Sequence, residues 1–246
     1  MDFAATQPNA SYLADQHFFT RLSLTLAVVI VFGFLQWALR GFVAPLATPI
    51  WIHLHAIAML GWLGTVVLQN RLAECGNLAL HRKLGWTSLV LVAAIAGLGI
   101  FAGRMALAMH RVPPFFSDAY FLALTHVEVI VFAAVVTAAI ALRRHTQWHR
   151  RLIIGATIIL MEPALGRLLP MPFLGQTLGG WLEAGLQLCF LGILARHDHR
   201  TLGRMHPATL LAMAIIVGIH GLIQMLAGTR SIAVLAEAIA RGSGAA

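Results

Sequence analysis

Four of the twelve histidines occupy matching places relative to apolar segments and could bind a metal. His55 lies near the start of one apolar segment, and His126 lies one to two turns inside another. His81 and His149 each stand just before an apolar segment. Histidine in or near a membrane span is costly unless it has a partner. The placement therefore predicts two pairs, His55 with His126 and His81 with His149.

The second pair repeats its local sequence, which indicates an internal repeat. The two copies are His81, Arg82, Lys83, Leu84 and His149, Arg150, Arg151, Leu152. Each copy ends a basic loop and begins an apolar helix. His55 precedes His81 by 26 residues, and His126 precedes His149 by 23. This spacing predicts a two-helix unit used twice in the same orientation, and two such units would form a four-helix bundle.

Paired histidines on facing helices are the ligand set of a b-type haem. The iron takes two axial imidazoles, and the core of a helix bundle is where such cofactors are held. The sequence thus predicts one or two haems b, one near each membrane surface, and an electron path across the bilayer. Four basic residues would lie where haem propionates emerge and could form charge-assisted hydrogen bonds to them. These residues are Arg82, Lys83, Arg150 and Arg151.

The same histidines leave two other functions open. A zinc-dependent membrane hydrolase would need three protein ligands and an open position for water. Its candidate ligands are His53, His55, His126 and His220. No HxxxH or HExxH pair places two of them on one helical face, which counts against this class. A non-catalytic assembly factor or carrier would use the histidines only structurally, because such residues are common at membrane interfaces.

One ligand position has two candidates. His53 competes with His55, but His55 shares a helical face with Trp62 and Gln69 at spacings of seven residues. His55 is therefore the preferred ligand.

Further ionisable residues fall inside the apolar segments, where they are candidates for function. They are Glu128, Glu162, Glu183 and His220. Glu162 and Arg167 flank Pro163 and are expected to form an ion pair. His220 and Gln224 are four residues apart on one helical face and could share a partner. The cluster of His197, Asp198 and His199 is expected in a solvated loop.

The composition requires lipid around most of the chain. Hydrophobic residues make up 59% of the 246 and charged residues 11%, with a mean hydropathy of +0.83. We expect an all-α integral membrane protein, a single polytopic domain over residues 1–246, whose spans two to five form the central four-helix bundle. About seven spans are predicted, near 22–44, 50–70, 84–103, 119–142, 150–168, 178–195 and 207–228. The fifth is the weakest, since Glu162 and Pro163 interrupt it.

The charge pattern indicates orientation and excludes other classes. The net charge of +8 comes from small groups of Lys and Arg between apolar runs, which argues for a bilayer and against nucleic acid as the partner. Eleven of these residues fall on the side of the N-terminus and six on the other, which predicts a cytoplasmic N-terminus. Cys75 and Cys189 support neither a disulfide framework nor a thiolate metal site.

The chain resembles uncharacterised bacterial multi-pass membrane protein families with an early helical histidine, a glutamine, an HRxLG element and an HRRLM-like element. The matching residues are His55, Gln69, His81 to Gly85, and His149 to Leu152, with Ile153 where methionine is usual. The resemblance covers about residues 50–170 and implies a bacterial inner (cytoplasmic) membrane.

A more distant similarity is to di-haem transmembrane cytochromes b, in which spans two and four share one haem and spans three and five the other. It implies the same two histidine pairs, and a quinone or another redox protein as partner. The departure is that His81 and His149 lie at helix starts, whereas in these cytochromes the ligands lie inside the helices.

Overall fold

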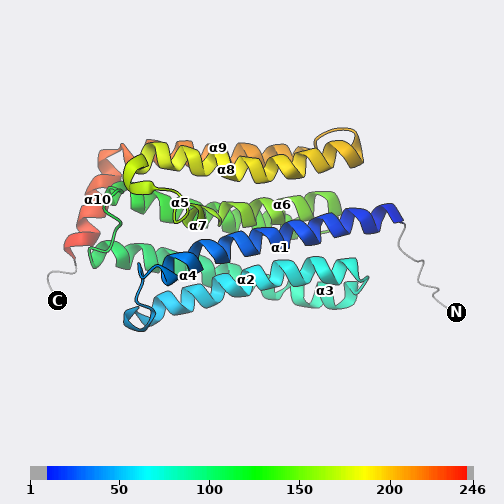
Figure 1. Ribbon diagram of the computed structural model, residues 1–246, viewed down its shortest axis with the longest axis horizontal. Coiled ribbons are helices and arrows are strands. Elements are labelled where there is room, and N and C mark those ends of the chain that lie inside the picture. The colour runs from blue at the N-terminus through cyan, green and yellow to red at the C-terminus, as the bar shows by residue number, and fades with distance from the viewer. Residues whose placement is uncertain (1–9, 243–246) are drawn as a thin grey trace.

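The computed structural model describes residues 10–242, and over that range the protein is all-helical. Figure 1 shows the long helices lying side by side along one axis. The elements are α1 (Ala10–Leu39), η1 (Pro45–Ala47), α2 (Ile50–Glu74), α3 (Leu78–Gly85), α4 (Thr87–Ala108), α5 (Asp118–Ala141), α6 (Thr146–Ile159), α7 (Glu162–Leu165), α8 (Met171–Leu202), α9 (Pro207–Ala227) and α10 (Arg230–Arg241). We call the end where α1 begins the proximal end, and the end that carries α10 the distal end.

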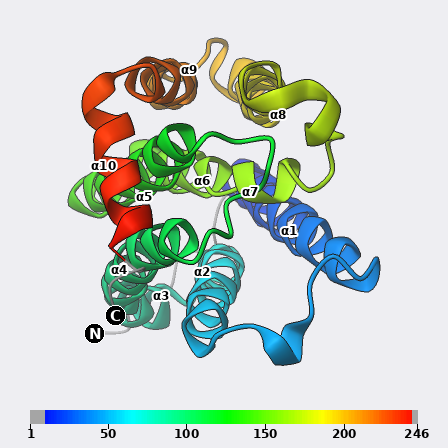
Figure 2. The same cartoon turned by 90° about the vertical axis from the view of Figure 1, so that its left-hand side faces the viewer.

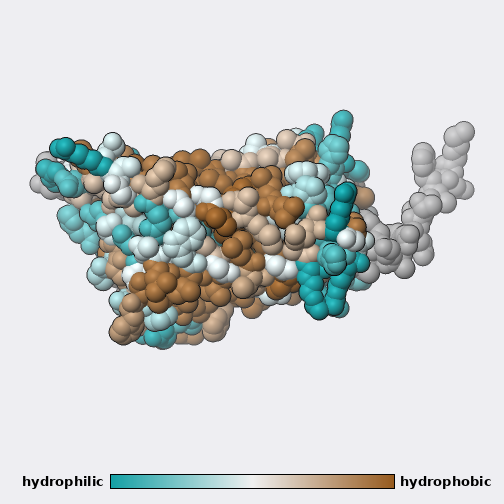
Figure 3. Space-filling model, turned by 90° about the horizontal axis from the view of Figure 1, so that it is seen from above, coloured by the Kyte–Doolittle hydropathy of each residue, from teal (hydrophilic) through white to brown (hydrophobic). Residues whose placement is uncertain are grey.

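Six segments are long and apolar enough to cross a membrane. They are Asp15–Leu39, Ile50–Glu74, Leu78–Ala108, Asp118–Ala141, Met171–Leu202 and Pro207–Ala227. Their outer faces carry large exposed apolar side chains such as Val28, Ile57 and Val90, which water would disfavour and lipid tails accommodate. On the face seen in Figure 3, hydrophobic surface covers the middle, and hydrophilic residues gather toward the two ends. The chain is therefore a multi-pass membrane protein.

The predicted fifth span, 150–168, is not one continuous helix. It consists of the short helices α6 and α7, which are separated by a break at Leu160 and Met161. Pro163 has no backbone N–H to bond the carbonyl of Ile159, so the helix cannot continue regularly. The Gln187 side-chain amide of α8 donates instead to the carbonyls of Ile158 and Ile159, at 3.0 and 3.2 Å.

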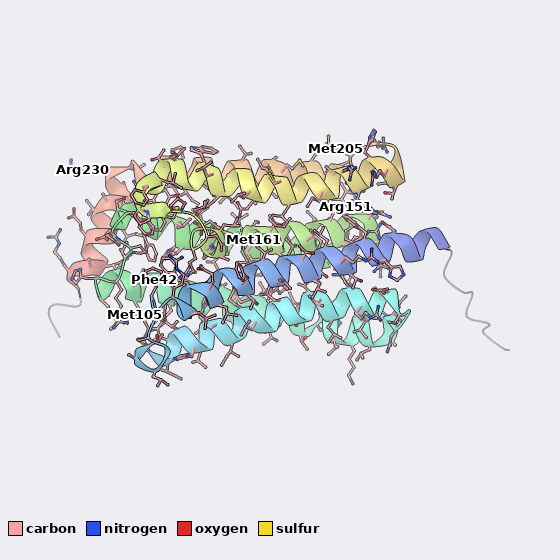
Figure 4. All side chains as sticks on the ribbon, in the orientation of Figure 1. Phe42, Met105, Arg151, Met161, Met205 and Arg230 are labelled. Atoms are coloured by element: carbon pink, nitrogen blue, oxygen red, sulfur yellow. The ribbon has the colours of Figure 1, made fainter. Side chains whose placement is uncertain are left out.

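This broken segment returns the chain from the proximal end of α5 to the distal end, where α8 begins (Figure 1). Most of its residues from Arg150 to Leu165 are buried by neighbouring helices. Irregular backbone at membrane depth is tolerated where protein covers it. Met161 marks the break in Figure 4.

The helices form three layers, which the end-on view makes plain (Figure 2). One layer contains α8 and α9, the middle layer α1, α5, α6 and α7, and the third α2, α3 and α4. Along the chain, α2 packs on α4, α4 on α5 and α5 on α6, while α1 packs against both α2 and α6. These contacts bring the start of α6 and the short helix α3 to the same proximal end.

The closest backbone approach between α1 and α7 depends on Gly33. A Cβ added there would lie 2.6 Å from the carbonyl oxygen of Ala164, which is backbone and cannot rotate away. We expect Gly33→Ala to destabilise the protein by about 1–3 kcal/mol, the usual cost of overpacking. Thermal unfolding in detergent measures this. The matched variant Gly64→Ala has nothing within 4 Å of the new methyl group, so its midpoint should not fall; equal losses would contradict the packing argument.

Candidate functional site

The imidazoles of His81 and His149 meet at the proximal end of the molecule. Their ring centroids are 6.4 Å apart and their planes are nearly perpendicular, at 84°. His81 comes from α3, and His149 from the first turn of α6. A metal held by two imidazole nitrogens at roughly 2 Å each would place the centroids roughly 6 Å apart. The separation of the two rings therefore fits one metal atom between them.

Hydrogen bonds orient both rings. The Nδ1 atom of His81 lies 3.1 Å from the carbonyl oxygen of Gln69, and that of His149 lies 2.8 Å from the carbonyl oxygen of Ala139. Ala139 O is one of the last carbonyls of α5 that have no partner within the helix. Because a carbonyl only accepts, each Nδ1 must donate its hydrogen. A neutral imidazole then keeps its Nε2 lone pair for a metal, the arrangement typical of metal-binding histidines.

The surroundings of this pair include polar groups without partners. Both side-chain atoms of Gln69 are buried, and neither has a hydrogen-bond partner among the described residues. The amide nitrogen of Gln69 would lie 3.8 Å from a Cβ added to Gly85, so a small residue stands beside it. A buried amide without a partner is costly. It is therefore a candidate to contact a bound group.

Arg82 and Lys83 are exposed next to His81, as propionate partners at a membrane surface would be. Sequence reasoning missed Arg143, which lies over the Trp86 ring at 5.5 Å on the same side of the molecule. Its signal was present in the sequence: it belongs to the basic loop that precedes His149.

Arg150 and Arg151, the other predicted propionate partners, lie elsewhere and have protein partners. Arg150 forms an ion pair with Asp15 of α1 and lies 4.3 Å from the Phe19 ring centroid. Arg151 is fully buried and forms an ion pair with Asp198 at 2.6 Å. Both guanidinium groups therefore already have carboxylate partners within the protein. Figure 4 shows Arg151 and Met205, and both lie toward the proximal end.

The expectation that residues 197–199 form a solvated loop is wrong, because all three lie in α8. Asp198 is fully buried and accepts hydrogen bonds from Arg151, from the Thr209 hydroxyl and from the backbone N–H of His206. His197 stacks on Phe18 with centroids 3.7 Å apart and bonds Asp15. The sequence indicated a loop because these residues are polar or charged and their partners in the fold come from other segments of the chain.

His206 caps α9 in a way that requires its neutral form. Its Nδ1 accepts a hydrogen bond from the backbone N–H of Ala208 at 3.1 Å. Burial lowers the pKa of His206, and the nearby positive charge of Arg151 lowers it further. Below about pH 6.5 the unfolded chain therefore binds a proton that the folded chain resists, and stability falls as the pH falls. We expect His206→Asn, which keeps a capping oxygen, to flatten this part of the pH dependence of the thermal midpoint. Identical slopes for both proteins between about pH 7.5 and 5 would contradict this role.

The distal pair is arranged differently. The Nδ1 of His126 lies 2.9 Å from the carbonyl oxygen of Leu122, whereas the Nδ1 of His55 is buried without a partner. A Cβ on Gly99 would lie 3.5 Å from the His55 ring and 3.3 Å from Val129. Within residues 10–242, no hydrogen bond or ring contact joins His55 to His126. The structure thus brings the proximal pair together and not the distal pair.

The zinc-hydrolase alternative finds no ligand set in the described part of the chain. No group of three or more His, Cys, Asp or Glu side chains there is placed to hold a metal ion. His220 instead bonds the side-chain oxygen of Gln187 through Nε2, at 2.9 Å.

The remaining polar residues inside the spans gather around α8. The expected ion pair of Glu162 and Arg167 does not form among the described residues. The Arg167 guanidinium instead donates to the carbonyl of Pro163 and lies 4.3 Å from the Phe34 ring centroid. His220 and Gln224 both face α8, as their spacing predicted, since a Cβ added to Gly180 would lie within 4 Å of each side chain.

Comparisons of this chain with protein-family models, with curated proteins and with solved structures found no match.

Proposed function

We propose that the chain is a haem b-binding membrane protein that carries electrons, with His81 and His149 as the axial ligands of one haem. The observation that carries this proposal is the 6.4 Å separation of the two rings, each oriented by a carbonyl at Nδ1. Haem iron supplies one-electron redox chemistry, and the protein supplies ligands, charge partners and a low-dielectric surrounding that tune its potential.

The residues around the pair support a macrocycle with carboxylate arms. Arg82 and Lys83 are exposed at the proximal surface, where charge-assisted bonds to propionates would form. The buried Gln69 side chain beside Gly85 can donate hydrogen bonds through its amide nitrogen and accept them through its oxygen.

Transfer across the whole membrane is the larger proposal, because it needs a second haem between His55 and His126. Support for that site is the buried Nδ1 of His55, which has no partner, and the small residue Gly99 beside it. An electron could then pass between the proximal and distal ends, with a quinone or another redox protein as donor or acceptor.

Haem stoichiometry of the purified protein tests the proposal. Extraction of the haem as its pyridine complex, divided by protein concentration, gives the number of haems per chain. A ratio of one supports a haem at the proximal pair, and a ratio of two supports the transmembrane path. A ratio near zero, from cells with ample haem, would contradict the proposal.

We also propose a bacterial inner-membrane location with the proximal end in the cytoplasm. Eleven of the seventeen Lys and Arg residues belong to that side by the topology, and positive charge favours the cytoplasmic side. Cys75 is exposed in the turn between α2 and α3 at the proximal end and provides the test. In a Cys189→Ala background, a membrane-impermeant maleimide should label Cys75 in broken cells and not in intact cells. Equal labelling in intact cells would reverse the orientation.

A further inference from the structure

Two buried carboxyl groups meet where the fifth crossing is broken. Glu162 begins α7, and Glu183 lies in α8; the two are 3% and 0% exposed. The Glu183 carboxyl lies against the turn that Glu162 begins, because a Cβ added to Gly166 would lie 2.6 Å from Glu183 Oε1 and 3.7 Å from the Glu162 backbone carbonyl oxygen. Both oxygens of Glu183 are buried without a donor from any other described side chain or backbone group. Since a carboxylate has no hydrogen to donate, the two groups can bond only when one of them carries a proton.

The space for this contact is provided by a glycine. A Cβ on Gly166 would lie 2.6 Å from Oε1 of Glu183, so any side chain at that position would displace the carboxyl group. Gln187, one turn further along α8, holds the broken backbone through Ile158 and Ile159. The two carboxyl groups therefore lie in a closely packed part of the interior.

The charges facing the pair come from several elements, and negative groups outnumber positive ones. From α5, Glu128 is 7% exposed with a buried Oε1 that has no partner, and the Tyr120 ring is 1% exposed. From α9, His220 approaches Gly180 of α8. Among the described residues, a nearby cation is Arg167, whose guanidinium already bonds the carbonyl of Pro163. Three carboxylates with one guanidinium in an apolar interior are strongly disfavoured, so protons must replace the missing cations.

Further polar groups lie beside the part of α8 that precedes Glu183, toward the distal end. A Cβ on Gly180 would lie 2.6 Å from the Tyr120 hydroxyl and 3.5 Å from the Gln224 amide nitrogen. That amide approaches the carbonyl of Gln176 at 3.5 Å. The Gln176 side chain in turn accepts a hydrogen bond from the backbone N–H of Ser117 at 2.8 Å, at the end of α5 that faces the distal side.

We propose that Glu162 and Glu183 hold one proton between them and form a proton-binding site that exchanges with the distal surface along Tyr120 and Gln224. The proton passes between a carboxyl oxygen and water, and no electron or other group is transferred. The site would let the protein take up or release a proton inside the membrane. It does not depend on the haem, because its residues are separate from both histidine pairs.

Infrared difference spectroscopy of the purified protein in lipid tests this site. We expect a C=O stretch of a protonated carboxyl group at neutral pH that shifts in deuterated water. The band should lose intensity in the double variant Glu162→Gln with Glu183→Gln, because the shared proton is gone and only the carboxyl group of Glu128 remains in this region. Glu237→Gln, whose side chain is exposed and pairs with Arg241, should leave it unchanged.

Each other outcome contradicts the proposal. Absence of the band in the unmodified protein would show that both carboxyl groups are ionised, and this result does not require any variant to fold. A band of unchanged intensity in the double variant would place the proton elsewhere. A band that does not shift in deuterated water would exclude exchange with the surface. The single variant Glu183→Gln should still fold, because the glutamine side chain is uncharged and has nearly the shape of a protonated carboxyl group.

Discussion

Replacing His149 by alanine is expected to reduce the haem content of the purified protein by about tenfold or more, because loss of a ligand should exceed the 10–100-fold cost of altering its outer partners. His81→Ala should have the same effect, since the two rings would hold one iron. The measurement is the reduced-form α-band per mole of protein. Remaining haem should be high-spin, with one axial position open.

The control for this pair is His145→Ala. His145 lies in the same basic loop and is exposed, so its removal should leave the spectrum unchanged. A rescue experiment separates ligation from folding: His149→Gly leaves room for free imidazole, and adding imidazole should restore the low-spin spectrum. Normal haem content in both alanine variants would show that the proximal pair does not bind the iron.

Asp198→Asn is expected to destabilise the protein by about 3–5 kcal/mol, the usual cost of removing one partner of a buried ion pair. The Asp198 side chain is fully buried, and its loss of charge leaves the fully buried Arg151 guanidinium without a counter-ion. Asn also presents an amide where two oxygens now accept hydrogen bonds from Arg151, Thr209 and His206. Thermal or denaturant unfolding in detergent measures the loss.

The comparison for Asp198 is Glu237→Gln. Glu237 also pairs with an arginine, Arg241, but both side chains are exposed, so the change should have no measurable effect on the midpoint. If both variants lost the same stability, burial of the α6–α8 pair would not be the cause. If Asp198→Asn had no effect, Arg151 would have found another acceptor.

The membrane class and most spans could be predicted from apolar runs, because lipid imposes a length and composition that sequence displays directly. The weakness of the fifth span was also visible at Pro163. The sequence alone could not show that the Gln187 side chain bonds the free backbone carbonyls at that break, because Gln187 is 28 residues from Ile159. A glutamine in an apolar helix signals a polar contact, but its partner depends on tertiary packing.

The candidate site was predicted in part. The repeated basic elements predicted that His81 and His149 would be paired, and the structure places their rings together. The sequence places His55 and His126 deeper in their spans than the proximal pair. No hydrogen bond or ring contact joins them among the described residues. The roles of Arg150 and Arg151 could not be foreseen, because Asp15 and Asp198 lie 135 and 47 residues away. Local spacing indicates which residues share a face, and only packing shows which charges already have partners.

Ligation of one haem by His81 and His149 can be tested by the low-temperature electron paramagnetic resonance spectrum of the oxidised, purified protein. Two imidazoles on one ferric haem with planes near the 84° of His81 and His149 should give a low-spin signal of the strongly anisotropic type, which near-perpendicular ligand planes produce. We expect that signal, and its loss in His149→Ala. A high-spin signal from the unmodified protein, or a protein without haem, would contradict ligation by this pair.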